Sequence, residues 1–178
     1  MRDTIDFTYD FESFNLLLNG SKVEDELFDP MEFAVGGLKE QFIFTCSCGV
    51  AGCAGWHFGV KVKTRKHTVE WRTVRTGNDR ISKGLKNFYS FDKTQYDDMR
   101  LRVMVALFDL AHRSQNGEFV DLIDEDDYTS ITPKSIEDLK RSIDYRVSFN
   151  EDCERDWDQK KFELFYKKVL TNLLNKVE

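Results

Sequence analysis

The sequence predicts a single α+β domain spanning residues 1–178, in which an antiparallel β-sheet of about four to six strands is packed by two or three C-terminal helices. Two patterns lead to this prediction. Apolar and polar residues alternate in several segments of residues 1–91, as in half-buried strands, whereas apolar residues recur with a helical period of about 3.6 in residues 92–178. The first part is therefore expected to be mainly β and the second mainly α, with the sheet in the N-terminal two-thirds of the chain.

Strands are expected where β-branched or aromatic residues lie between turn signals. Strict alternation over residues 5–11 predicts the first strand, and Asn19-Gly20 predicts a turn after the apolar run that follows it. Two segments rich in β-branched residues, separated by the polar residues 64–67, predict a β-hairpin. The remaining predicted strands, including the two of this hairpin, are 41–46, 59–63, 68–74 and the short segment 88–91.

Helices are expected from residue 92 onward. Thr132-Pro133 predicts one helix start, because Thr accepts hydrogen bonds from free N–H groups and Pro at the first helical position loses none. Asn150 predicts another, since the acidic residues that follow it suit the positive end of a helix dipole. The principal helix starts after Asp92 and stops at Asn116-Gly117. Its apolar stripe comprises Tyr96, Met99, Val103, Leu107, Leu110 and Ala111.

Charge is distributed unevenly along the chain. The net charge is −6, but residues 1–40 carry −7, residues 57–88 carry +7 and residues 89–178 carry −6. Either the opposite charges neutralise each other within the fold, or one of these surfaces steers a charged partner. No apolar run approaches the roughly 20 residues that cross a bilayer. The acidic, alternating N-terminus does not resemble a secretory signal, and four Cys are too few for a disulfide scaffold, so a cytoplasmic protein is expected.

Three thiols and an imidazole lie within the twelve residues 46–57, and they are the ligand types that structural zinc prefers. The spacing is unusual, because the first two Cys are separated by one residue rather than by two to four. Two other interpretations stay open: a Gly-rich hairpin whose Cys residues are small buried hydrophobes, and a disulfide between two of the thiols. The candidate zinc ligands are Cys46, Cys48, Cys53 and His57.

The same segment resembles a recurring pattern in small uncharacterised bacterial proteins. The resemblance rests on the string CSCGVAGCAG at residues 46–55, followed by Gly59-Val60 and then by Val69-Glu70-Trp71. It covers residues 41–74, under a fifth of the chain. It implies a β-hairpin unit with no settled activity and a bacterial, cytoplasmic source, and it implies no ligand or catalytic assignment.

Enzymatic chemistry finds little support in the sequence. Cys53 with His57 or His67 has the residue types of a thiol nucleophile and its base, but no oxyanion donor or orienting acid can be assigned. The chain contains none of the common phosphate-binding, dinucleotide-binding, serine-hydrolase or zinc-protease motifs. We therefore expect a protein without enzymatic activity, without a small-molecule substrate, and without a cofactor other than a possible structural zinc ion.

Nucleic-acid binding is one non-enzymatic alternative, in the form of a small zinc-stabilised module. Trp56 or Trp71 has the side chain to stack on bases, although core packing is the commoner fate of Trp71 in an alternating strand. The isoelectric point of about 5.2 opposes this alternative, because it sets long-range repulsion against phosphates. The cations that the hairpin would present to a nucleic acid are Lys61, Lys63, Arg65 and Arg72.

The function favoured by the sequence is that of an immunity protein, which binds and neutralises a basic bacterial toxin such as a contact-dependent growth inhibition nuclease. Residues 118–127 contain six carboxylates and no cation, and such a surface captures a cationic partner quickly by electrostatic steering. A phage or bacterial anti-defence protein that mimics nucleic acid uses the same physics. A solvated acidic loop and a metal site are the other interpretations of this segment. The predicted toxin-binding residues are Asp121, Asp124, Glu125, Asp126 and Asp127.

Overall fold

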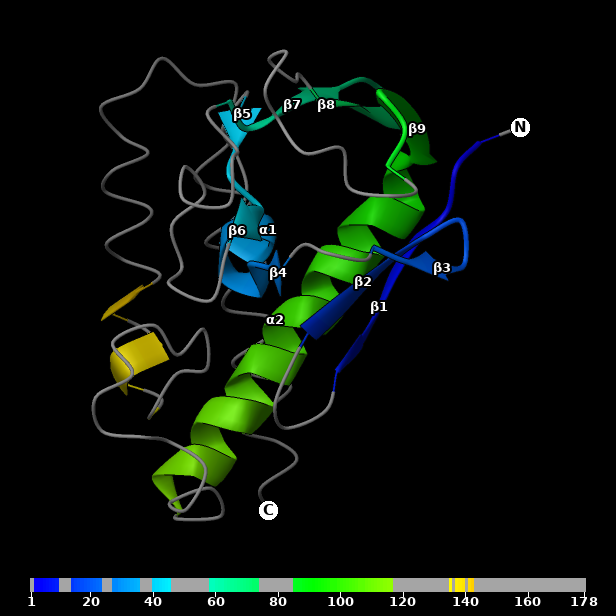
Figure 1. Ribbon diagram of the computed structural model, residues 1–178. Helices are drawn as coiled ribbons and strands as arrows, with labels where there is room; N and C mark the ends of the chain where they lie inside the picture. Colours follow the sequence, from blue (N-terminus) through cyan, green and yellow to red (C-terminus); the bar gives the residue numbers. More distant parts are fainter. Residues whose placement is uncertain are drawn as a thin grey trace.

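The computed structural model describes residues 2–9, 14–23, 27–35, 40–45, 58–73, 85–116, 135, 137–139 and 141–142, and it confirms the α+β class. Figure 1 shows a long helix, α2, with a sheet across its N-terminal end, strands along one flank and a short helix beside the other. In chain order the elements are β1 (Ile5–Tyr9), β2 (Phe14–Leu18), β3 (Ser21–Lys22), β4 (Leu27–Phe28), α1 (Pro30–Val35), β5 (Glu40–Gln41), β6 (Phe44–Thr45), β7 (Val60–Thr64), β8 (Thr68–Thr73), β9 (Phe88–Asp92) and α2 (Lys93–Gln115).

The described strands are distributed over three antiparallel sheets rather than the one expected. Their orders are β1-β2-β3, β4-β6 and β5-β7-β8-β9. The predicted strand 41–46 is divided, because Gln41 pairs with β7 in one sheet whereas Phe44 pairs with β4 in another. The predicted hairpin of residues 59–74 is confirmed as β7 and β8, and β9 confirms the predicted strand 88–91.

The turn predicted at Asn19-Gly20 is confirmed, and its backbone explains the residue choice. Asn19 and Gly20 both have positive φ angles, of 54° and 78°, a conformation that Asn and Gly tolerate better than other residues. Asn19 also ties the turn to the start of β1, since its Oδ1 accepts a hydrogen bond of 2.9 Å from the Thr4 amide. Its side-chain amide donates to Asp3 Oδ1.

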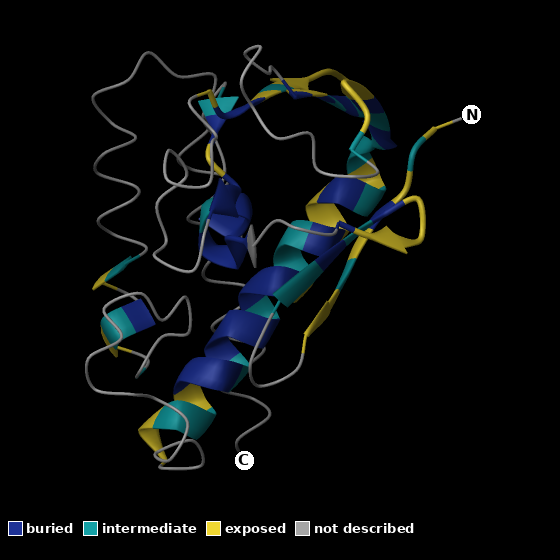
Figure 2. Ribbon diagram, viewed as in Figure 1, coloured by how far each residue is buried: buried dark blue, intermediate teal, exposed yellow. Residues whose placement is uncertain are grey.

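Helix α2 begins and ends where the sequence predicts. Asp92 is its N-cap, with a side chain that accepts hydrogen bonds from the amides of Thr94 (2.9 Å) and Gln95 (3.4 Å), and Asn116 is its C-cap. All six residues of the predicted apolar stripe are buried, and Figure 2 shows dark blue stretches that recur on successive turns of the helix, separated by teal and yellow ones. The structure therefore confirms that α2 is the principal helix of the core.

The centre of the core is aromatic. Trp71 of β8 lies edge-on to Phe91 of β9 (5.1 Å between ring centroids, 81° between planes) and to Tyr96 of α2 (5.9 Å, 86°). The indole N–H of Trp71 donates a buried hydrogen bond of 3.1 Å to the Tyr96 hydroxyl. This bond satisfies a polar group that burial would otherwise leave without a partner, and it links the sheet to the helix.

Helix α1 was not expected from the sequence, although its start signal is present. Asp29 precedes Pro30, and its Oδ1 accepts hydrogen bonds from the amides of Met31 (3.0 Å) and Glu32 (2.9 Å). An Asp N-cap followed by Pro at the first helical position is a strong initiation signal. The apolar residues that follow are buried and anchor the helix in the core.

Arg100 of α2 holds the other end of α1. Its guanidinium donates to the carbonyl oxygens of Ala34 (2.9 Å) and Val35 (2.7 Å), which close the last turn of α1. Burial lowers the pKa of Arg100, because desolvation penalises the charged form. The two carbonyl groups compensate this partly buried cation, so α1 and α2 are joined by hydrogen bonds as well as by apolar packing.

The N-terminal segment covers part of the outer edge of β9. The Asp3 amide donates to the Ser90 carbonyl, and the Ser90 amide donates to Asp3 Oδ2, both at 2.9 Å. Burial raises the pKa of the Asp3 carboxyl, but hydrogen bonds from Ser90, Asn19 and Lys86 outweigh it, so that the pKa is lowered overall. Asp3, which precedes β1, and Ser90 of β9 are thereby held together at this edge of the sheet.

The later helices are described only in part. Residues 137–139 and 141–142 are helical, and Leu139 is fully buried. The Ser135 hydroxyl accepts a hydrogen bond of 3.0 Å from the Asp138 amide, as a capping side chain does, whereas the helix start predicted at Thr132-Pro133 lies outside the described residues. The helix predicted from Asn150 lies outside the described residues.

Candidate binding surface

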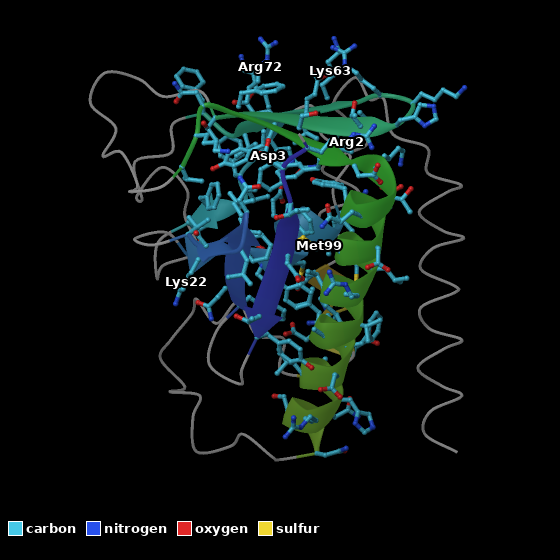
Figure 3. All side chains as sticks on the ribbon, turned by 90° about the vertical axis from the view of Figure 1, so that its right-hand side faces the viewer. Arg2, Asp3, Lys22, Lys63, Arg72 and Met99 are labelled. Atoms are coloured by element: carbon cyan, nitrogen blue, oxygen red, sulfur yellow. The ribbon has the colours of Figure 1, made fainter. Side chains whose placement is uncertain are left out.

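The strongest candidate site in the described residues is the outward side of the four-stranded sheet. Along β7 and β8, buried residues such as Val60 and Trp71 alternate with exposed cations. Lys61, Lys63 and Arg72 all occupy outward positions, and we call them the basic face. Figure 3 shows Lys63 and Arg72 rising from the side of the sheet that is turned away from α2. The period of two in the strands thus places the core on one side of the hairpin and the charge on the other.

The strand register places Lys61, Arg72 and Phe88 in one row across the sheet, and Lys63 in the next outward row, opposite Glu70. Lys61 lies directly opposite Arg72, which in turn lies opposite Phe88 of β9, and on the other side Lys61 lies opposite Glu40 of β5. Neighbouring strands are about 4.8 Å apart, and alternate residues of one strand about 6.8 Å. The backbone positions of Lys63, Lys61 and Arg72 therefore lie within about one Debye length of each other, so the electrostatic fields of the three side chains add.

Glu40 marks one end of this row. Its Oε1 accepts a hydrogen bond of 2.8 Å from the Gly59 amide. A Cβ atom at Gly59 would lie 2.8 Å from the Gln41 carbonyl oxygen and 2.8 Å from Glu40 Cγ, closer than real Cβ atoms approach. Gly59 is thus required for β5 to lie against β7, and this contact places a carboxylate beside Lys61 at the edge of the basic face.

Arg65 is one of the cations that the sequence predicts for contact with a nucleic acid, but the structure gives it a partner within the chain. Its guanidinium forms an ion pair with Glu70 through two hydrogen bonds, one of them 3.2 Å long. The hydrogen bond from Arg65 and the nearby charges of Lys63 and Arg72 lower the pKa of the Glu70 carboxyl. Because Glu70 is committed to Arg65, Lys63 makes no ion pair within the described residues.

The aromatic group on the outward side is Phe88, which the sequence analysis did not single out. Its side chain is 46% exposed, and the Arg72 guanidinium lies 5.9 Å from its ring centroid, within cation–π range. Trp71, the stacking candidate, is fully buried, so its expected core packing is confirmed and its use for stacking is excluded. Both assignments follow from the register, because adjacent residues of a strand face opposite sides.

Several predicted site residues lie outside the described residues. His67 is exposed in the turn between β7 and β8, but its proposed thiol partner Cys53 is not described, so their pairing is untested. Within the described part of the chain, no group of three or more His, Cys, Asp or Glu side chains could hold a metal ion. The undescribed candidates are Cys46, Cys48, Cys53, His57 and Trp56 of the central segment and Asp121, Asp124, Glu125, Asp126 and Asp127 of the acidic segment.

Comparisons with models of protein families, with curated proteins and with solved structures all gave no match. Among the residues that the structure describes, no helix combines the length and the apolar character needed to cross a membrane. We therefore base the functional inference on the charge and geometry of the basic face.

Proposed function

We propose that the protein is a binding protein without catalytic chemistry, and that the basic face is a surface on which it receives an anionic macromolecule. The observation that carries this proposal is the direct cross-strand pairing of two cations, Lys61 and Arg72, on the outward side of the sheet. Like charges directly opposite each other destabilise a sheet. Glu40 beside Lys61 and the Phe88 ring beside Arg72 offset part of this repulsion, but the two cations still leave positive charge on the outward side, which supports contact with an external negative charge.

The shape of the surface favours a large partner over a small molecule. The basic face lies on the broad side of a sheet, with cations on β7 and β8 and an exposed aromatic ring on β9. Small-molecule sites are usually concave and mostly apolar, whereas a convex or flat charged side suits a partner that spans several residues. Steering by the combined field of Lys61, Lys63 and Arg72 would speed the encounter with such a partner.

A polyanion column tests this proposal. The wild-type protein is expected to bind heparin at low ionic strength despite its net charge of −6, and Lys61→Glu with Lys63→Glu is expected to elute at clearly lower salt. Lys22→Glu with Arg141→Glu is the matched control, since both residues are exposed on other elements and the change in net charge is the same.

Two results would contradict the proposal. If the wild-type protein passes through heparin without retention, the basic face is not a polyanion-binding surface. If both double variants lower the eluting salt equally, overall charge rather than the basic face governs binding. Retention of the control variant near the wild-type position is the result that supports a local surface.

A second candidate function is that of a cytoplasmic immunity protein, and the concentration of six carboxylates in residues 118–127 favours it. In this proposal the partner is a basic toxin, which would bind residues 118–127 rather than the cations of the basic face. Co-expression with the product of a neighbouring toxin gene is expected to yield a one-to-one complex. Replacing Asp124, Asp126 and Asp127 together by Lys is expected to slow its association, and an unchanged rate would exclude this segment as the toxin-binding surface.

A further inference from the structure

We infer that the basic face binds single-stranded nucleic acid, with phosphates on Lys61 and Lys63 and bases stacked on Phe88 and the neighbouring Arg72. This inference rests on the proposed function and names the class of its anionic partner. It depends on a juxtaposition that the sequence did not reveal, namely an exposed aromatic ring at the end of a row of cations on one side of one sheet.

The aromatic ring distinguishes this surface from a merely basic one. Phe88 is nearly half exposed although it is a large apolar residue in a strand, and it lies opposite Arg72 in the register. Bases stack on aromatic rings whatever their identity, because every base has a π face, and Arg guanidinium groups stack on bases as well. Phe88 and Arg72, 5.9 Å apart, therefore provide two adjacent stacking groups beside the phosphate-binding Lys residues.

Single strands fit this arrangement better than duplexes. In a duplex the base faces are covered by their neighbours, so Phe88 would find only edges and backbone, whereas an unpaired strand presents its bases for stacking. An open β-sheet with aromatic residues on its outward side and cations around them is an established solution for binding unpaired strands. The row from β9 to β7 gives such a strand a path across the sheet, with the base at Phe88 and phosphates toward Lys61 and Lys63.

An acidic protein is the other class of anionic partner, and the structure favours it less. An acidic peptide that extended the sheet would need an open edge, but β5 is only two residues long and Asp3 covers β9 at Ser90. An acidic protein surface would pair with the Lys residues but would not require Phe88. The contribution of Phe88 therefore separates the two classes.

The test measures the binding of fluorescently labelled oligouridine and oligothymidine of about 12 nucleotides, within the range of common single-strand sites, by fluorescence anisotropy. Phe88→Ala is expected to weaken binding by about 5- to 150-fold, the range measured for loss of one stacked base. Phe88→Leu, which keeps the apolar bulk but loses the ring, is expected to behave like Phe88→Ala, and Phe88→Tyr like the wild type. Because Phe88 is exposed, these variants should fold, and their thermal melts check this.

Salt dependence tests the phosphate contacts separately. Each phosphate contact contributes about 0.7 to the slope of log affinity against log salt for single strands, so Lys61→Gln should reduce the magnitude of the slope by about 0.7. Lys22→Gln, an equal charge change on β3, should leave the slope unchanged. A comparison of the two oligonucleotides distinguishes RNA from DNA as the preferred strand, and a duplex of the same length is expected to bind more weakly than either.

The outcomes distinguish failure of this inference from failure of the proposed function. If heparin binds through the basic face but neither oligonucleotide binds, or if Phe88→Ala binds both as the wild type does, the inference is wrong and the proposed function stands. If neither heparin nor oligonucleotide binds, both are wrong. Heparin has no bases, so Phe88→Ala should leave the heparin elution unchanged while it weakens oligonucleotide binding.

Discussion

The buried hydrogen bond between Trp71 and Tyr96 gives a direct test of how the sheet is attached to α2. Tyr96→Phe removes only the hydroxyl that accepts the indole N–H of Trp71 at 3.1 Å. Since Trp71 is fully buried, its N–H is then left without a partner, which costs about 1–3 kcal/mol of unfolding free energy. For a chain of this length we expect the melting temperature to fall by about 2–12 °C.

A double-mutant cycle isolates this bond from the packing of the rings. Trp71→Phe removes the donor together with much apolar surface, so it is expected to destabilise the protein more than Tyr96→Phe does. In the Trp71→Phe background, however, Tyr96→Phe should cost little, because no N–H remains to be left unpaired. Urea unfolding of the four proteins measures the coupling. Equal costs of Tyr96→Phe in both backgrounds would refute the importance of this bond.

The ionisation of Tyr96 supplies a second readout. Burial raises its pKa to about 12, so the unfolded chain, whose tyrosines ionise near 10, binds fewer protons than the folded protein at high pH. The stabilising contribution of Tyr96 is therefore fully present below about pH 10 and is lost as the pH rises from there through about 12. Tyr96→Phe should lack this part of the decline, and parallel stability curves for the two proteins over that interval would contradict the assigned burial.

Two further predictions concern single contacts. Gly59→Ala should destabilise the protein by about 1–3 kcal/mol, because the new methyl group would lie 2.8 Å from the Gln41 carbonyl oxygen. Urea unfolding measures this loss, and an unchanged midpoint would show that β5 is not held against β7 as described. Asp92→Ala should lower the unfolding free energy by about 1 kcal/mol, because the N-cap of α2 is lost. Asp92→Asn, whose side chain can still cap the helix, should retain most of this stabilisation. Hydrogen bonds from the amides of Gln95 and Thr94 lower the pKa of Asp92, so this stabilisation is present above the ordinary carboxyl pKa and is lost in acid as the pH falls through the lowered value. Thermal melts at neutral pH and in acid check this, and equal melts of Asp92→Ala and wild type at neutral pH would contradict it.

Local signals in the sequence were sufficient to predict the elements that carry the basic face. The polar residues 64–67 between two β-branched segments predicted the β7–β8 hairpin, and the change to a helical period after Asp92 predicted the start of α2. These predictions succeeded because hairpin turns and helix caps depend on residues that are close together in the chain.

Features that depend on which strands pair, and in which register, were not predicted. The division of residues 41–46 between two sheets depends on partners in β4 and β7, and the ion pair that occupies Arg65 depends on the register of the hairpin. Register also decides that Phe88 is exposed whereas Trp71 is buried, since a shift of one residue would reverse both. The Asp29-Pro30 signal of α1 was present in the sequence, but six residues give no helical period to accompany it.

The contact between Asp3 and Ser90 limits how the sheet can meet other polypeptides. Both backbone groups of Ser90 are engaged by Asp3, so at this point the margin of the sheet offers neither amide nor carbonyl to an incoming chain. Open margins recruit further strands and lead to polymers. Because the first residues of the chain occupy this point, a further strand cannot pair with β9 at Ser90, which guards this margin against self-assembly.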